Sequence, residues 1–582
     1  MMRKLHSELH FANYKNNLTT FIFSIIISII SIVNAEAQNK AAAIDNLMKH
    51  CSANGIFNGT ILVSEDGKVI YKKAFGYLNN ETKQKLTTKS VFGLASVSKQ
   101  FTAMGIMILQ ERNKLSYSDK LIKYFPELPD YAKDITVRNL LNHTSGLPQY
   151  YEYTDKDNLH NSEILKILIN RNQLDFKTGE QYVYNNGGYV LLALIIEKIS
   201  NQPFEAFLKE NIFDPLEMKN TLVCSDSLFR IRNRAIGYTR IGETDDFRIS
   251  HTGSTSMISN VDDLFLWEQS LYGQKLVSNK TMDEAFMSVF LNNGSISNYG
   301  FGWKIKNHKQ DKTVEHSGSD FGYRTFIKRN LTKNNSYILL TNNGDAVALN
   351  EINGAIDNIL EVNAYELPKI PVFSKLKESL KNNSTDTAIE ITRQAIKKTP
   401  DLFAFDDDAI NELGYKYLVE KKTNDALSIF KFNAELNPNS SNVYDSLGEV
   451  YLVVNDTVNA AENYKKSIKL DSNNANAITV LTKLGISSAE LVAKVIVPSE
   501  VLRSYGGKYQ LNNNYFFTVT SDDKQLFIQG TGEAITTVFP MSQNRFYSKI
   551  ISAQFTFNTD QNGKIASLTI NMGSDIIAKK IE

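Results

Sequence analysis

Cysteine is scarce in this sequence: 582 residues contain only Cys51 and Cys224. Two cysteines exclude a disulfide framework, although they could form one bridge in an oxidising compartment. The eight histidines are scattered along the chain, and no two cysteines lie near each other, so no zinc site is suggested. A glycine-rich phosphate loop is also missing. We therefore expect an activity that needs no metal and no cofactor.

Neither sign of charge is in excess. Lys and Arg number 64, Asp and Glu number 63, and the formal net charge is +1. This balance gives no reason to expect a nucleic-acid partner. The chain is too long for one hydrophobic core, and its 42% hydrophobic and 22% charged residues are typical of globular proteins. We expect two to four domains.

The N-terminus has the pattern of an export signal. Positive charges at Arg3, Lys4 and Lys15 precede an apolar run over residues 21–33, and an A-x-A cleavage pattern ends at Ala37. The run is short for a membrane span, and no cysteine follows it to carry a lipid. We predict a signal peptide over residues 1–37 and an exported, periplasmic or secreted protein whose mature form has no transmembrane span. An uncleaved anchor is the alternative.

Residues 40–365 have strands at both ends and helices between them. The first strands flank a turn at 65–68, the last strands lie near 313–340, and a closing helix covers 349–360. This order predicts one antiparallel sheet built from both ends of the segment, with an inserted helical subdomain.

Two further regions follow, which makes the expected fold class multidomain α+β. In 375–490 a helical pattern repeats at an offset of 34 residues, the period of tetratricopeptide helix pairs. The first copy holds Gly414, Tyr417, Ala426, Phe430 and Leu436, and the second holds Gly448, Tyr451, Ala460, Tyr464 and Leu470. Such repeats present a concave surface, so a protein partner is possible there. Residues 498–582 consist of short β-runs separated by Asn, Asp and Gly turns and predict a small antiparallel barrel or sandwich.

Ser96 and Lys99 are the first candidate catalytic residues. They precede an apolar-periodic run up to Asn113, so Ser96 is predicted to begin a helix and Lys99 to lie one turn along the same face. A serine hydroxyl needs a base within hydrogen-bond reach, and a buried lysine can be that neutral base. Because a serine and a lysine three apart are common by chance, this pair alone is a weak signal.

Tyr184 and Asn186 form the second candidate pair. They lie two residues apart in a glycine-flanked loop ahead of an apolar helix, a spacing that can direct both side chains into one cavity. The alternative is a turn closed by asparagines with a tyrosine packed beneath it.

Three motifs in this order resemble the serine β-lactamase and penicillin-binding superfamily. They are Ser96-x-x-Lys99, Tyr184-x-Asn186 and His316-Ser317-Gly318. The resemblance covers residues 40–365 and is greatest to the branch of class C β-lactamases, DD-peptidases, D-aminopeptidases and esterases. Satellite segments at 66–68, 142–147, 179–180 and 299–303 strengthen it.

The resemblance implies a role for each motif. Ser96 would be the acylated nucleophile, Lys99 would activate it, and Tyr184 would relay a proton to the leaving group and later activate water. Asn186 would hold Lys99 and a substrate amide. The third motif would lie on the edge strand and bind substrate through His316, Ser317, Gly318 and Ser319. Backbone N–H groups of Ser96 and Ser319 would form the oxyanion hole.

The third motif departs from the pattern of dedicated β-lactamases, which have lysine where this chain has His316. A histidine is mostly neutral at pH 7, whereas a lysine charge suits a β-lactam carboxylate. This departure favours hydrolysis of a D-peptide, amide or ester through an acyl-enzyme. The alternatives are a penicillin- or peptidoglycan-fragment sensor without efficient turnover, a true β-lactamase, and a scaffold with vestigial catalysis. The other reading of His316 is a core histidine bonded to the sheet.

Overall fold

The computed structural model describes most of the chain after the predicted signal peptide. The described residues are 38–156, 158–224, 231–246, 248, 251–308, 311–344, 348–486, 497–512, 515–548, 551, 553–560, 563–571 and 575–581. The predicted signal peptide, residues 1–37, lies outside them. No helix among these residues is both long and apolar enough to cross a membrane.

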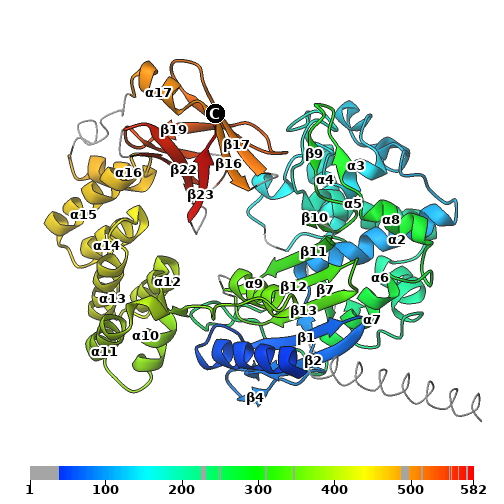
Figure 1. The fold of residues 1–582 in the computed structure, drawn as a ribbon, viewed down its shortest axis with the longest axis horizontal. Helices are drawn as coiled ribbons and strands as arrows, with labels where there is room; N and C mark the ends of the chain where they lie inside the picture. The colour runs from blue at the N-terminus through cyan, green and yellow to red at the C-terminus, as the bar shows by residue number, and fades with distance from the viewer. Residues whose placement is uncertain are drawn as a thin grey trace, which may run out of the picture.

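A six-stranded antiparallel sheet is the centre of the N-terminal part (Figure 1). Its order is β10 (Lys304–His308), β11 (Asp311–Asp320), β12 (Tyr323–Asn330), β13 (Asn335–Thr341), β1 (Gly59–Glu65) and β2 (Lys68–Phe75). Because β1 pairs with β13, both ends of the segment build one sheet, as predicted. Asp66 and Gly67 have positive φ values of 48° and 69°, which suit the tight turn between β1 and β2.

The two faces of this sheet bury alternating residues. Ile61 and Val63 face a core shared with a helix over residues 38–53 and with α9 (Leu349–Leu360). Leu62, between them, belongs to the larger core of the helical subdomain on the other face. Successive side chains of a strand point to opposite faces, so this alternation shows that both faces of the sheet are covered by packed side chains.

The helical subdomain lies between β2 and β10 in the chain. Its helices are α2 (Lys99–Glu111), α3 (Val137–Leu141), α4 (Asn161–Ile169), α5 (Asn186–Ser200), α6 (Phe204–Leu208), α7 (Val261–Ser270) and α8 (Asn279–Ala285). Three small sheets lie in the described part of this segment. One pairs β3 (Tyr77–Asn79) with β4 (Gln84–Lys85), one has the order β5 (Phe92–Gly93), β7 (Met257–Ser259) and β6 (Leu222–Val223), and one pairs β8 (Val289–Phe290) with β9 (Ile296–Ser297). Cys51 and Cys224 are both buried and free, so the bridge that the sequence left open is not formed.

A helical region follows the sheet domain. It contains α10 (Val372–Leu380), α11 (Thr385–Lys398), α12 (Asp407–Val419), α13 (Thr423–Leu436), α14 (Ser441–Val453), α15 (Thr457–Leu470) and α16 (Ala475–Lys483). Gly414 of α12 faces the ring of Phe430, and Gly448 of α14 faces the ring of Tyr464 in the same way. Small residues thus let each helix pair approach closely. The tetratricopeptide assignment stays a prediction.

The C-terminal part is a closed antiparallel barrel, which decides between the two predicted forms. After α17 (Ser499–Tyr505) its strands are β16 (Gly507–Asn512), β17 (Tyr515–Ser521), β18 (Leu526–Gly530), β19 (Thr536–Pro540), β20 (Arg545–Ser548), β21 (Gln554–Thr559), β22 (Ile565–Asn571) and β23 (Asp575–Lys580). Closure comes from pairing of β16 with β23.

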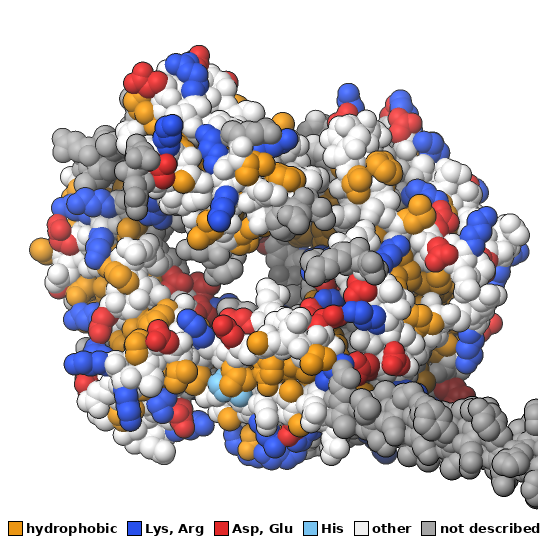
Figure 2. Space-filling model, in the orientation of Figure 1, with side chains coloured by type: hydrophobic (Ala, Val, Ile, Leu, Met, Phe, Trp, Pro, Cys, Tyr) orange, Lys and Arg blue, Asp and Glu red, His pale blue; other side chains and the backbone are white. Residues whose placement is uncertain are grey.

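The three parts surround a hollow, which the space-filling view shows at the centre of the molecule (Figure 2). Arg240 of the sheet domain pairs with Asp406 beside α12 at 3.4 Å. On the other side of the hollow, Gly532 of the barrel lies against the carbonyl oxygen of Ile296 in β9. The helical region and the barrel therefore each contact the sheet domain directly.

Candidate active site

Ser96 lies in a short 3-10 turn, η1 (Ala95–Ser98), that leads into α2. The helix itself begins at Lys99, so Ser96 precedes the helix that it was expected to begin. Ala95 has φ of +49°, a left-handed conformation that costs a residue with a Cβ about 1–3 kcal/mol. This left-handed conformation turns the chain sharply just before Ser96, the candidate nucleophile.

The end of β11 lies against this turn. β10 pairs with β11 only as far as Glu315, so residues 316–320 have β12 on one side and an unpaired edge on the other. Gly318 permits the close approach, because a Cβ there would overlap the Leu94 carbonyl oxygen and touch the Ala95 Cβ at 3.0 Å. The side chains of Ser317 and Ser319 are exposed beside it. The structure thus brings the third motif to Ser96.

Lys99 is completely buried on the first turn of α2. Its Nζ forms hydrogen bonds with Ser96 Oγ at 3.1 Å and with the Ser254 carbonyl oxygen at 2.9 Å. Burial holds the pKa of Lys99 well below its ordinary value of 10.5, against a smaller opposing effect of the Asp320 carboxylate. A neutral amine within hydrogen-bond reach of a serine hydroxyl is the arrangement that general-base activation requires.

Tyr184 lies over the same amine. The segment carrying it is pinned to His143, whose carbonyl accepts from Val183 N–H at 3.0 Å and whose Nδ1 accepts from Asn185 N–H at 3.1 Å. The Tyr184 ring centre is 4.8 Å from Lys99 Nζ.

The Tyr184 hydroxyl is buried without a hydrogen bond of ordinary geometry. Burial raises its pKa strongly, and only the nearby Ser96 hydroxyl opposes that rise. A protonated phenol without a fixed partner, next to the serine, is able to give or take a proton once substrate is bound.

Asn186 does not hold Lys99 in this structure. It is the first residue of α5 and is half-buried, and among the described residues no hydrogen bond joins it to Lys99. The preceding Asn185 is buried instead, caps α5 by accepting from Gly188 N–H at 2.9 Å, and donates to the Leu147 carbonyl at 2.7 Å. The alternative in which an asparagine closes the turn therefore applies to Asn185, whereas Tyr184 lies beside Lys99.

His316 is buried and neutral. Its Nδ1 is 2.7 Å from the Ser317 carbonyl oxygen, which can only accept, so Nδ1 carries the proton. Its Nε2 then accepts from the Tyr299 hydroxyl at 2.8 Å. Burial and the nearby Lys99 lower the pKa of His316 to about 3. The third motif therefore brings no positive charge to the cleft.

Sequence reasoning missed two parts of this site. The Ser254 carbonyl is a backbone group in an irregular segment, and no side-chain pattern marks it. The sequence places His143 in the satellite segment 142–147 but gives no sign that it supports Tyr184. Its buried ring lies 4.3 Å from the Tyr184 ring, centre to centre, and its φ of +60° is a further strained position.

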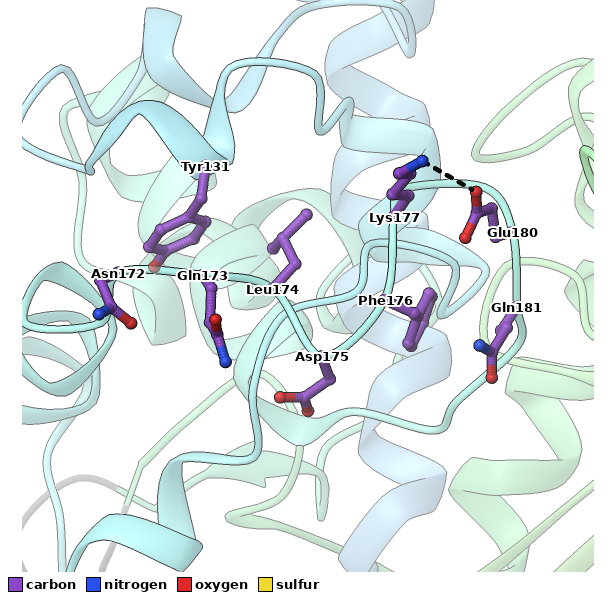
Figure 3. A pocket seen from close by; sticks show the side chains of 9 residues that line it. All are labelled: Tyr131, Asn172, Gln173, Leu174, Asp175, Phe176, Lys177, Glu180 and Gln181. Atoms are coloured by element: carbon purple, nitrogen blue, oxygen red, sulfur yellow. Dashed lines mark ion pairs between the residues drawn. The ribbon is translucent and has the colours of Figure 1, made fainter. Parts of the chain in front are cut away.

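A separate surface hollow of about 590 Å³ lies on the loop that leads to Tyr184 (Figure 3). It is open to solvent and lined by Tyr131 and residues 172–177, 180 and 181, with Lys177 and Glu180 paired across its rim. None of these residues belongs to the Ser96 cluster. Its lining therefore offers no nucleophile and base pair like that of Ser96 and Lys99.

An antiparallel sheet with an inserted helical subdomain, and a serine, a lysine and a phenol meeting at the edge strand, define the class of the β-lactamase and penicillin-binding superfamily. The family model described as Beta-lactamase matches residues 41–360, more than half of the chain, and the chain belongs to that family. A second model, described as a domain of unknown function (DUF3471), matches residues 492–582.

Known proteins with similar sequences share this family's segment. "Penicillin-binding protein 4*" of Bacillus subtilis (strain 168) is 35% identical over 376 residues, which cover 60% of this chain and 82% of that protein. "Protein flp" of Staphylococcus aureus (strain MW2) is 27% identical over 316 residues, and the match covers 51% of this chain and 62% of flp. A solved D-amino acid amidase from Ochrobactrum anthropi SV3 is 25% identical with a TM-score of 0.48, covering 55% of this chain and 99% of its own.

Proposed function

We propose that the protein is an exported serine hydrolase that acts through an acyl-enzyme on a D-peptide, amide or ester. The observation that carries this proposal is the 3.1 Å hydrogen bond between Ser96 Oγ and a buried Lys99 amine whose pKa is well below its ordinary value. In acylation Ser96 Oγ attacks the substrate carbonyl carbon and its proton passes to Lys99.

The negative charge that forms on the carbonyl oxygen would be stabilised by the backbone N–H groups of Ser96 and Ser319, at the contact between η1 and the unpaired edge of β11. The carbon–nitrogen or carbon–oxygen bond then breaks, and the leaving group takes a proton from Lys99 through Tyr184. In the second half-reaction water attacks the acyl carbon and gives a proton to the Tyr184–Lys99 pair; the bond from that carbon to Ser96 Oγ breaks, and Oγ takes the proton from the pair. Lys99 and Tyr184 act as one coupled unit in this scheme.

The test is covalent labelling of the full-length protein with a fluorescent fluorophosphonate and a fluorescent penicillin, with the modified residue located by mass spectrometry. Ser96→Ala is expected to abolish both labels. Ser98→Ala is the matched control, because Ser98 is a buried serine two residues away whose Oγ has no hydrogen-bond partner. Labelling that survives in Ser96→Ala, or that maps to another residue, contradicts the proposal.

The rate of deacylation separates hydrolysis from sensing. An acyl-enzyme that forms on Ser96 and then disappears with release of product supports the hydrolase, and one that persists supports a penicillin- or fragment-binding sensor. A substrate panel of nitrocefin, D-Ala-D-Ala peptides, D-amino-acid amides and p-nitrophenyl esters identifies the bond that is cleaved.

We further propose export through the predicted signal peptide and a protein partner on the helical region. The supports are the charged and apolar pattern of residues 1–37 and the 34-residue repeat of 375–490. N-terminal sequencing of the protein from the cell envelope tests the first, with cleavage after Ala37 as the expected result.

A further inference from the structure

Asp320 is a carboxylate near Lys99 that the proposed reaction does not use. It ends β11, one residue after Ser319, on the part of the strand that β10 leaves unpaired. The side chain is half-buried, and its Oδ2 accepts from Thr255 Oγ1 at 2.7 Å. Thr255 directly follows Ser254, whose carbonyl accepts a hydrogen bond from Lys99, so Asp320 and the base are attached to the same short segment.

In the described part of the chain this carboxylate has no cation in direct contact. Among the described residues no salt bridge engages Asp320, and its second oxygen has no hydrogen-bond donor. The nearby Arg324 donates to the backbone carbonyls of Phe321 and Tyr323 rather than to Asp320. Lys99 forms no ion pair with Asp320, and burial holds the pKa of Lys99 well below its ordinary value while Asp320 opposes that shift. Among the residues that the structure describes, one oxygen of this carboxylate is therefore free to accept from a donor outside the protein.

Burial raises the pKa of Asp320, and the charged Arg324 and Asp245 act on it with opposite signs, whereas two histidines of this region are neutral. His316 has a pKa of about 3, and His251, whose Nε2 lies 3.3 Å from the Tyr150 hydroxyl, has a pKa of about 4 because both imidazoles are buried. Tyr150 itself is close enough to Asp320 for the carboxylate to raise its pKa. Beside Arg324, the surroundings of Asp320 therefore offer the negative charge of its carboxylate and uncharged hydrogen-bonding groups.

We propose that Asp320 binds the free ammonium group of the substrate, so that the enzyme selects amino-acid amides or peptides with an unblocked α-amino group. This inference rests on the proposed function. A substrate carboxylate at this position would be repelled by the like charge of Asp320. A substrate ammonium would instead donate a charge-assisted hydrogen bond to the partly desolvated Asp320 carboxylate. Such bonds are worth roughly 10- to 100-fold in affinity.

The alternative role of Asp320 is to hold Thr255 and thereby aim the Ser254 carbonyl at Lys99. That role would depend on the Thr255 hydrogen bond and not on the substrate's charge. The two readings differ in which variant changes the preference between a charged and a neutral substrate.

The experiment compares D-alanine p-nitroanilide with N-acetyl-D-alanine p-nitroanilide on the full-length protein. The readout is the ratio of the two kcat/KM values. The wild type is expected to prefer the free amine, and Asp320→Asn is expected to lower that ratio by 10-fold or more. Thr255→Val, which removes the hydrogen bond and keeps the charge, is expected to retain most of the ratio. Asp357→Asn, an acid on α9 across the sheet that pairs with Lys328, is the control for loss of a charge elsewhere.

Binding is measured in parallel as protection of Ser96 from the fluorophosphonate by D-alanine amide and by N-acetyl-D-alanine amide. This readout needs no turnover, and the wild type alone decides it if Asp320→Asn fails to fold. Equal protection by the two amides, an unchanged ratio in Asp320→Asn, or an equal loss in Thr255→Val overturns the inference. If Ser96 is not labelled at all, the proposed function falls with it. A labelled Ser96 without preference for the amine overturns this inference alone.

Discussion

Gly318→Ala is the sharpest test of how the fold positions Ser96. The added methyl would overlap Thr325 Oγ1 and the Leu94 carbonyl oxygen and would touch the Ala95 Cβ at 3.0 Å. Ordinary contacts of this kind are about 3.5 Å apart, so the Leu94 oxygen would lie about 1 Å too close. Thr325 cannot rotate away without cost, because its hydroxyl donates to the same Leu94 oxygen at 2.8 Å. The turn η1 must therefore retreat from β11 by a substantial part of 1 Å.

A displacement of this size in a catalytic constellation costs about 100-fold in rate, or roughly 2.7 kcal/mol of transition-state stabilisation. Overpacking a core contact costs about 1–3 kcal/mol of unfolding free energy, which a domain of this size can lose and remain folded. We expect Gly318→Ala to fall about 100-fold in kcat/KM on a p-nitrophenyl ester, while thermal unfolding shows a folded protein with a modestly lower midpoint.

The control is Gly354→Ala, in the middle of α9, where an added methyl contacts nothing within 4 Å. Alanine is favoured over glycine in a helix by about 1 kcal/mol, so this variant should keep its activity and gain a little stability. If Gly318→Ala keeps its activity within threefold of the wild type while folded, the contact between β11 and η1 does not set the geometry of the site.

Two further predictions concern buried charge. Arg329→Met should cost about 3–5 kcal/mol of unfolding free energy, because it leaves the fully buried Glu268 carboxylate without the guanidinium 3.3 Å away. The double variant that adds Glu268→Gln should recover part of that loss when the variants are compared by thermal unfolding. An equal loss in both variants would contradict this account of the pair. In the pH profile of kcat/KM, activity should be lost as pH falls through the depressed pKa of Lys99, and no step near 6.5 should arise from His316, whose pKa is about 3. Activity confined to pH above about 9 would mean that Lys99 keeps its ordinary pKa.

The sheet and the hairpin that begins it could be predicted from sequence because local patterns specify them. A β-rich run predicts a strand in which Ile61, Leu62 and Val63 are buried on alternate faces of the sheet. Gly67 indicates the turn that follows it. The spacing of Ser96 and Lys99 predicted that they lie together, and the 3-10 turn η1, with three residues per turn, brings them within 3.1 Å even though Ser96 precedes the helix.

Other parts of the site depend on geometry that no local pattern encodes. Asn185 and Asn186 are identical in chemistry, and only the start of α5 decides which one caps the helix and which one is its first residue. The Ser254 carbonyl reaches Lys99 across 155 positions of the chain, and a backbone oxygen has no residue type by which to recognise it. Asp320 follows the third motif directly, and its contact with Thr255, 65 positions away, has no local sequence pattern.

The ammonium subsite and the base should be coupled electrostatically. Asp320 raises the pKa of Lys99, while burial lowers it. A substrate ammonium bound to Asp320 cancels part of the opposing charge, so the pKa of Lys99 should fall further in the complex with a free amine than in the complex with its acetylated analogue. Arg324 and Asp245 also act on Asp320, with opposite signs, but they are present in both complexes.

Single-turnover acylation measured against pH separates the two complexes, because it reports the pKa values of the bound state. The acid limb for D-alanine p-nitroanilide should lie at lower pH than the limb for N-acetyl-D-alanine p-nitroanilide. In Asp320→Asn the two limbs should coincide at a pH below the acetylated limb of the wild type, because the charge that raises the pKa of Lys99 is then gone. An acid limb at higher pH for the free amine would show that its ammonium is bound away from Asp320, and the coupling would be refuted together with the subsite.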